Sequence, residues 1–399
     1  MLFASVAVLL LIGVLWTDQV PVVTGLRGII VSPDVLINDY LGTGGPRASM
    51  INAALVGALG VLLLGWTRTP ITGPAMAAVF TMVGFSFFGK NIVNVPPIIL
   101  GVYLFARYRR ESFQQYVLIA LFGTSLSPVV SQFAFGYGWG LPLGVLAGIL
   151  AGLAVPALAK HLIHLHQGLL LYNVGFTAGF IGTLLTAQLR AYGVAGTQPL
   201  IWTEEHHLPL AIVFGLYFAS FLLVAVVLEP TAWRRLGQLV RHPGALVTDF
   251  VALEGLPATL MNMSLVSLIG FCYILLVGGR LNGPTLGALF TMLGFAAFGK
   301  HPRNIIPPMV GVYLATLLKI WRATEPGPML AALFVTGIAP ISSTYGPLLG
   351  LVAGYLHLSM VMHVGWLHGG LNLYNNGFSG GVVAMIIVAL ANGFGRRHD

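Results

Sequence analysis

One stretch of 32 residues occurs twice in this chain, and it constrains the fold more than any other feature. Residues 73–104 and residues 283–314 align without a gap at an offset of 210, with 17 identities in 32 positions. Both copies carry the pattern G-P…F-T-x-x-G-F-x-x-F-G-K…N…P…G-V-Y-L. Because the period is about half of the chain, the sequence predicts a duplicated domain and not a solenoid of short repeats.

The duplication extends through most of both halves. Upstream residues keep the offset of 210, and downstream residues match at 212 and then at 202: Asp39/Asp249, Asn52/Asn262, Thr124/Thr336, His161/His363, His166/His368, Tyr172/Tyr374 and Asn173/Asn375. The changing offset requires only short insertions and deletions, which loops tolerate. The sequence therefore predicts a first membrane repeat at 1–189, a polar linker at 190–207 and a second membrane repeat at 208–399.

The composition indicates that both repeats lie in a lipid bilayer. Hydrophobic residues make up 57% of the chain and charged residues only 8%, whereas a soluble domain has about 25% charged residues. We expect an all-α polytopic protein of the bacterial inner (cytoplasmic) membrane, with about five or six hydrophobic segments in each repeat. The net charge of +8 is expected from loops that face anionic lipid. Basic runs with interleaved aromatic residues are absent, so we expect no nucleic-acid partner.

Several of the apolar segments are too short or too interrupted to cross a bilayer. Residues 2–23 and 50–66 are predicted spans, but residues 73–88 form a run of only 16 bounded by Gly-Pro and Gly-Lys, and a spanning helix needs about 20. Short Gly- or Pro-bounded segments at equivalent positions of two halves point to a transport site. We therefore predict re-entrant or broken helices at the repeat interface. The sequence leaves open whether the repeats are parallel or inverted.

Aromatic rings and one hydroxyl recur on one face of each short segment. Phe85 and Phe88 are three residues apart and share a helix face, and Thr81 lies one turn earlier. Such a face suits a narrow path for a small polar solute, because rings exclude bulk water and the hydroxyl replaces a lost hydrogen bond. Ordinary packing between helices is the alternative. The predicted path is lined by Thr81, Phe85, Phe88, Thr291, Phe295 and Phe298.

A second duplicated motif, H-x-x-x-x-H-x-G-x-x-x-Y-N-x-G-F, supplies neutral hydrogen-bonding groups. Imidazole and amide groups both donate and accept, which suits an uncharged solute or a proton relay. Helix capping and bonds between helices are the alternative. We expect no metal site, because His164 is replaced by Trp366 in the second copy and no Cys or acid accompanies the histidines. The motif adds His166, His368, Tyr172, Tyr374, Asn173 and Asn375 to the predicted path.

Lys90 and Lys300 follow the two short segments directly. A lysine within the membrane is a functional-site hypothesis by default, although a lysine at a helix end can also extend to the lipid headgroups. The alternative to the neutral path is an anion site that comprises Lys90, Lys300, Asn94 and Asn304. The matched acids Asp39 and Asp249 are predicted helix caps. We expect no catalytic residues and no cofactor, because nucleotide-binding and hydrolase motifs are absent.

The duplicated core, with L-Y-N-x-G-F late in each copy, resembles a family of bacterial membrane proteins of unknown function over nearly the whole chain. A weaker resemblance is to urea transporters, which also duplicate a half with a short pore helix and carry a G-Y-N element. Leu171-Tyr172-Asn173 and Leu373-Tyr374-Asn375 stand in similar sequence here. The L-P-x-x-T-x-P-F signature of urea transporters is absent, so the resemblance does not imply selectivity for urea.

Together these features favour a membrane channel or facilitator for a small, uncharged polar solute of urea or amide type, with its path at the repeat interface. The first alternative is a secondary transporter for a small anion that uses Lys90 and Lys300. A membrane-embedded enzyme is the least favoured, because the sequence shows no acid–base constellation. The expected partners are the solute and the lipid bilayer, and both a monomer and a homo-oligomer stay open.

Overall fold

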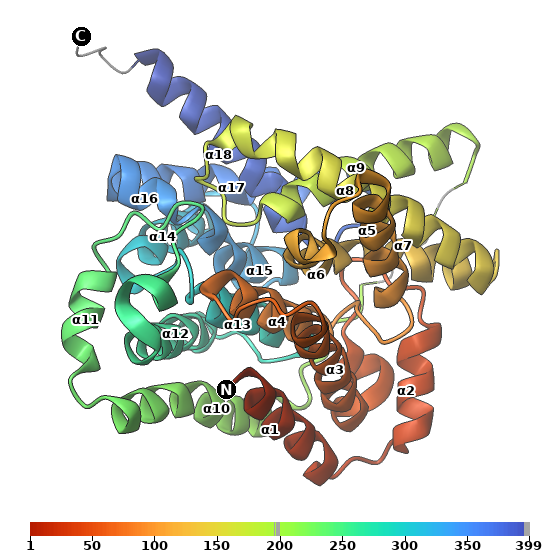
Figure 1. Ribbon diagram of the computed structural model, residues 1–399, viewed down its shortest axis with the longest axis horizontal. Coiled ribbons are helices and arrows are strands. Elements are labelled where there is room, and N and C mark those ends of the chain that lie inside the picture. Colours follow the sequence, from red (N-terminus) through yellow and green to blue (C-terminus); the bar gives the residue numbers. More distant parts are fainter. Residues whose placement is uncertain (195, 197–199, 395–399) are drawn as a thin grey trace.

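The computed structural model describes residues 1–194, 196 and 200–394 (Figure 1). Within these ranges the secondary structure is helical, apart from a single β-bridge between Asn38 and Ile201. Helices satisfy their own backbone hydrogen bonds, which a bilayer demands, and the predicted all-α fold is confirmed. Residues 195 and 197–199 of the predicted linker, and residues 395–399 of the predicted second repeat, lie outside the described residues.

The helices follow the same order in both halves of the chain. The first half contains α1 (Leu2–Leu15), α2 (Val22–Val31), α3 (Tyr40–Trp66), α4 (Gly73–Phe85), α5 (Val95–Arg109), α6 (Val117–Gly123), α7 (Ser127–Ser131), α8 (Leu141–His166) and α9 (Asn173–Ala191). The second half contains α10 (His207–Leu228), α11 (Ala232–Leu239), α12 (Phe250–Leu276), α13 (Gly283–Phe295), α14 (Pro302–Leu318), α15 (Pro326–Phe334), α16 (Pro340–Tyr345), α17 (Pro347–Leu367) and α18 (Asn375–Phe394).

Seven helical runs among the described residues are long and apolar enough to cross a membrane. They are α3, the run Val117–Gly136, α8, α10, α12, α17 and α18. Shorter apolar helices accompany them, including α1, α2, α4 and α13. The chain is therefore a multi-pass membrane protein, and a lipid bilayer is its surroundings.

The predicted first span over residues 2–23 is wrong. The first helix, α1, ends at Leu15, because Trp16 turns to extended backbone with φ −68° and ψ 127°. A separate helix, α2, begins at Val22 after Pro21. Proline fits the start of a helix better than its interior, since it has no backbone N–H to donate.

The predicted second span starts earlier than residue 50 and contains a break. Within α3, Gly45 has φ 82° and ψ 159°, and Pro46 follows it. Within α12, the equivalent Gly255 has φ 79° and ψ 164°. Glycine adopts positive φ without steric cost, so both repeats bend their longest helix at the same place.

The two short helices α4 and α13 form the centre of the molecule, between the helices of the two halves (Figure 1). Each has 13 residues, which gives about 20 Å of helix against about 30 Å of bilayer core. The prediction of short, non-spanning helices is confirmed. They run antiparallel in direct contact, since a Cβ at Gly84 would lie 2.5 Å from the Gly287 carbonyl oxygen, and one at Gly294 would lie 3.0 Å from the Ala77 Cα. Glycine thus lets the backbones touch.

Each central helix begins on a carboxylate from the other repeat. Asp39 caps its own helix α3, and the same oxygen accepts a hydrogen bond of 3.1 Å from the backbone N–H of Gly283. Asp249 caps α12, and its oxygen accepts a bond of 3.0 Å from the backbone N–H of Gly73. The predicted capping role is confirmed, and the same two residues lock the repeats together.

Candidate functional site

Each central helix ends in a turn that carries a lysine. The Asn52 side-chain amide donates to the backbone carbonyls of Ser86 and Lys90, both at 2.8 Å. Asn262 donates in the same way to the carbonyls of Ala296 and Lys300, both at 2.7 Å. Carbonyls at a helix end lack partners within the helix, so these asparagines satisfy them and fix both lysine-bearing turns.

Asn94 and Asn304, which the sequence grouped with the lysines as an anion site, brace the same turns. Their side-chain amides donate to the carbonyls of Gly89 at 3.0 Å and Gly299 at 2.8 Å. Their side-chain oxygens accept from the backbone N–H of the residue after each lysine, at 2.8 and 2.9 Å. These contacts occupy the amides within the turn.

Lys90 and Lys300 are completely buried, each with 0% of its surface exposed. Their ammonium groups lie 5.0 Å from the ring centre of Phe85 and 5.1 Å from that of Phe295, respectively. The ion pairs among the described residues involve neither lysine, since they are Arg109–Glu111, Arg235–Glu229 and His242–Glu254. Such burial differs from the headgroup position that a helix-end lysine would take.

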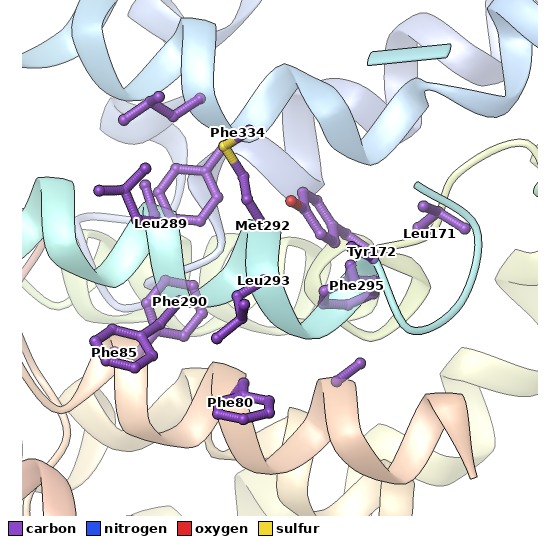
Figure 2. Close-up of a cluster of buried hydrophobic side chains, with 14 of the residues drawn as sticks. Phe80, Phe85, Leu171, Tyr172, Leu289, Phe290, Met292, Leu293, Phe295 and Phe334 are labelled. Atoms are coloured by element: carbon purple, nitrogen blue, oxygen red, sulfur yellow. The ribbon is translucent and has the colours of Figure 1, made fainter. Parts of the chain in front are cut away.

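Tyr172 and Tyr374 each cross to the opposite repeat. Tyr172 meets Phe295 edge to face at 4.8 Å, and Tyr374 meets Phe85 in the same way at 4.5 Å. The two tyrosine rings are themselves 5.1 Å apart. Figure 2 shows Tyr172 beside Phe295 at one end of the contact between α4 and α13. The two L-Y-N motifs are therefore exchanged at the centre of the molecule.

Backbone hydrogen bonds hold the exchanged motifs in place. The N–H of Leu171 donates to the Gly337 carbonyl at 2.8 Å, and the N–H of Leu373 donates to the Ser125 carbonyl at 3.0 Å. Each bond joins one repeat to the broken helix run of the other. The tyrosine that follows each leucine is thereby placed against the opposite lysine-bearing turn.

The surroundings of the two lysines differ. The ammonium group of Lys300 donates to the Tyr172 hydroxyl and, at 2.8 Å, to the Thr336 hydroxyl. The equivalent groups around Lys90 do not pair. Among the described residues, the Lys90 ammonium and the Tyr374 hydroxyl have no hydrogen-bond partner.

The predicted histidine and asparagine residues close the turns between long helices. His166 Nε2 donates to the Asn173 side-chain oxygen at 3.0 Å, and the Asn173 amide donates back to a carbonyl of α8 at 3.0 Å. His368 and Asn375 repeat the first bond at 2.9 Å, and Asn375 bonds a carbonyl of α17 at 3.1 Å. This geometry matches the helix-joining alternative stated for the motif.

The remaining predicted path residues surround the central aromatic groups. Phe88 and Phe298 each contact the preceding phenylalanine of their own motif, at 5.0 and 5.1 Å between ring centres. The Thr291 hydroxyl donates to a backbone carbonyl of its own helix at 2.8 Å. The Thr81 hydroxyl has no partner among the described residues. The two threonines therefore differ in the same sense as the two lysines.

A cavity of about 180 Å³ lies at the repeat interface. It brings together five of the predicted path residues: Tyr172, Asn173, Phe295, Phe298 and Tyr374. A water molecule takes roughly 30 Å³ of liquid, so the cavity accepts only a small solute. Neither lysine is among the lining residues, but Tyr172 both lines the cavity and bonds Lys300.

The chain matches a protein family over residues 19–191 and 228–393, and that family is described as a protein of unknown function (DUF1576). The chain belongs to this family. The two matched segments of the DUF1576 family fall one in each half, in keeping with the duplication. The chain matches no curated protein and no solved structure. The weaker likeness to urea transporters rests on short sequence elements alone.

Sequence reasoning missed two residues that this DUF1576 chain places beside its tyrosines. Thr336 bonds Lys300, and Ser125 holds the backbone of Leu373. The matched stretches 124–128 and 336–340 contain both positions. Their spacing shows that the two stretches are equivalent, and it does not indicate that either residue lies near the L-Y-N motif of the opposite half.

A buried acid, Asp34, was also missed, and it stands in the first repeat only. Its carboxylate accepts hydrogen bonds from the side chains of Asn38, Asn91, Asn94 and Ser131, at 2.9 to 3.3 Å. Burial raises the pKa of Asp34 to about 7, against these bonds, which lower it. At an offset of 210 the second repeat has Gly244.

Proposed function

We propose that this membrane protein is a secondary transporter for a small anion in the bacterial inner membrane, with its substrate site around Lys90 and Lys300. The observation that carries the proposal is the complete burial of two lysines that lack an acidic partner among the described residues. Moving an ammonium group out of water costs several kcal/mol unless an opposite charge compensates. A bound anion supplies that charge.

The burial of both lysines favours the anion transporter over the neutral-solute channel, which the sequence had favoured. If the solute were neutral, both lysines should lie at the entrance of the path, close to water. The anion alternative called for lysines deep in the protein, and both have 0% exposure. The cavity beside Tyr172 supports a solute of small size, a property that small anions share with small amides.

A carrier explains the sealed centre better than an open channel does. Tyr172, Tyr374, Phe85 and Phe295 are each at most 2% exposed, so aromatic rings close off the lysines. Transporters built from two repeats bind substrate between the repeats and open to each side by moving one repeat against the other. The contacts between the exchanged tyrosines and the opposite repeat are the ones that such a movement would change.

Purified protein in liposomes tests the proposal. Influx of nitrate, chloride and formate would be measured beside influx of urea, which has no charge. We expect wild-type protein to transport at least one of the anions and not urea, and the Lys90→Gln/Lys300→Gln double variant to lose that uptake. Lys160→Gln is the matched control, because Lys160 is exposed, and it should transport like wild type. Urea uptake that survives in the double variant, without anion uptake by wild type, would refute the anion carrier.

A further inference from the structure

The two lysines belong to half-sites that are equivalent in sequence and different in structure. We define half-site one as Lys90, Thr81, Ser125 and the exchanged Tyr374. Half-site two is Lys300, Thr291, Gly337 and the exchanged Tyr172, with Thr336 beside them. The four residues of half-site one align with the first four of half-site two. A difference between their hydrogen bonds therefore comes from the side chains and contacts around them.

Half-site two satisfies its own polar groups. Lys300 donates to Tyr172 and Thr336, and Thr291 donates to a carbonyl in its own helix. The ammonium group also lies 4.6 Å from the ring centre of Tyr172, which adds a favourable cation–π contact. The hydrogen-bonding groups named here therefore have partners within the protein, although no carboxylate balances the charge of Lys300 among the described residues.

Half-site one holds four buried polar groups that lack a hydrogen-bond partner among the described residues. They are the Lys90 ammonium and the hydroxyls of Tyr374, Thr81 and Ser125. Each of these residues is at most 1% exposed. A buried donor without a partner costs about 1–3 kcal/mol, and more when it is charged, so four of them in one place indicate a ligand.

Two of the four residues contact Phe85. The Lys90 ammonium lies 5.0 Å from the Phe85 ring centre, and the Tyr374 ring centre lies 4.5 Å from it. Thr81 is one turn earlier than Phe85 on the same helix. The backbone carbonyl of Ser125 accepts from the N–H of Leu373, the residue directly before Tyr374.

One residue explains why the two halves differ. A Cβ placed on Gly337 would lie 2.3 Å from the ring of Tyr172, far closer than two carbon atoms can approach. Glycine therefore allows Tyr172 to reach Lys300. The equivalent residue in the first repeat is Ser125, which carries the Cβ that Gly337 lacks, and there the tyrosine and the lysine do not bond.

We propose that half-site one binds a single small monovalent anion, held by Lys90, Tyr374, Thr81 and Ser125; this rests on the anion transport proposed above. All four groups can donate hydrogen bonds, and one ammonium group balances one negative charge. The ligand class is a compact monoanion that only accepts hydrogen bonds, such as nitrate, formate or a halide. A cation does not fit this set, because the site offers it no carboxylate, and a neutral amide would leave the charge of the ammonium group unbalanced.

Thermal unfolding of the detergent-purified full-length protein tests this assignment. Nitrate, formate and chloride would be titrated against gluconate, a bulky anion that keeps the ionic strength constant. A ligand that binds only the folded state raises its stability with concentration. We expect wild type and Lys160→Gln to be stabilised by at least one small anion, and Lys90→Gln to lose the effect; Lys300→Gln is measured beside them to compare the two half-sites.

Two milder variants keep the test valid if Lys90→Gln does not fold. Tyr374→Phe retains the packing on Phe85 and removes one donor, so the apparent dissociation constant should rise about tenfold, the equivalent of about 1.4 kcal/mol. Ser125→Gly should weaken anion binding at least as much. It removes one donor and gives half-site one the glycine of half-site two, where the lysine is hydrogen-bonded by the protein itself. Unchanged affinity in both variants would overturn the assignment.

The outcomes separate this inference from the transport proposal. If Lys300→Gln loses anion binding and Lys90→Gln keeps it, half-site one is the wrong half and the anion transporter still stands. If no small anion stabilises wild-type protein more than gluconate does, both proposals are overturned.

Discussion

The two repeats agree in the bonds that hold their backbones and differ in the side chains at their centre. Asn52 and Asn262 bind equivalent carbonyls, and Asp39 and Asp249 cap equivalent helices. Around Lys90 and Lys300, in contrast, the donors of one half-site are paired and the other has unpaired donors. Both halves have thus kept the same backbone contacts at the centre, while the hydrogen bonds of the side chains around the two lysines differ.

Asp34 gives the comparison a second, independent difference. The first repeat buries this acid among amide and hydroxyl donors, and the second repeat has Gly244 in its place. Four predictions test which differences between the repeats affect the protein, in order of decreasing expected effect.

The largest effect concerns the pH dependence of stability. The pKa of Asp34 rises from 3.8 to about 7 on burial, so the folded protein binds this proton more tightly than the unfolded chain does. The free energy of unfolding should therefore fall as pH rises from about 4 to about 7, by up to about 4 kcal/mol for this group. Thermal unfolding of wild type and Asp34→Asn across this range measures it.

The Asp34→Asn curve should be flatter than that of wild type, because the variant cannot titrate at this position. The difference between the two curves isolates Asp34 from the other groups that titrate in the same range. If the two curves are parallel, the titration of Asp34 does not change the free energy of unfolding, and this difference between the repeats does not affect stability.

The next prediction tests the shared backbone contacts. A Cβ at Gly84 would lie 2.5 Å from the Gly287 carbonyl oxygen, and one at the equivalent Gly294 would lie 3.0 Å from the Ala77 Cα. Gly84→Ala and Gly294→Ala should each lower the free energy of unfolding by about 2–3 kcal/mol, because overpacking forces the central helices apart. Gly65→Ala is the control, since no atom lies within 4 Å of its new Cβ. Markedly unequal losses at the two central positions would break the symmetry of these contacts.

The third prediction compares the exchanged tyrosines. Tyr172→Phe removes a hydrogen bond to an ammonium group and should cost about 1.5–2 kcal/mol of stability. Tyr374→Phe removes a hydroxyl without a partner among the described residues and should change stability little in buffer that contains gluconate alone. Unfolding curves of both variants measure this difference. If both variants lose a similar amount of unfolding free energy, the two half-sites are equivalent in solution.

The smallest effect should separate the two threonines. Thr291→Val removes a bond of 2.8 Å to a helix carbonyl and should cost about 0.5–1 kcal/mol. Thr81→Val, whose hydroxyl lacks a partner in the described part of the chain, should leave stability unchanged or raise it slightly. The reverse order would contradict the assignment of the unpaired donors.

The central helices and their caps could be predicted from the sequence because they occur once in each repeat. The alignment at an offset of 210 found the short helices α4 and α13 and the capping acids. The burial of Lys90 could not be predicted, because a Gly-Lys-x-x-x-Asn turn has the composition of a loop near water. Its ammonium group lies beside Phe85, whose ring packs against Tyr374 from the other repeat, and no spacing within one repeat indicates that contact. The predicted span over residues 2–23 was wrong for a local reason, since the polar residues Thr17, Asp18 and Gln19 interrupt the apolar run directly after Trp16, where α1 has ended.

The crossed capping of the central helices has a consequence for how this protein arose and how it is made. Thr72 and Asn282 cap α4 and α13 from within their own repeats, and Asp249 and Asp39 each add one further acceptor from the other repeat. A half-length ancestor would have obtained this second acceptor only in a homodimer, each copy supplying its aspartate to the other. In the fused chain, residue 249 has to be synthesised before α4 receives it.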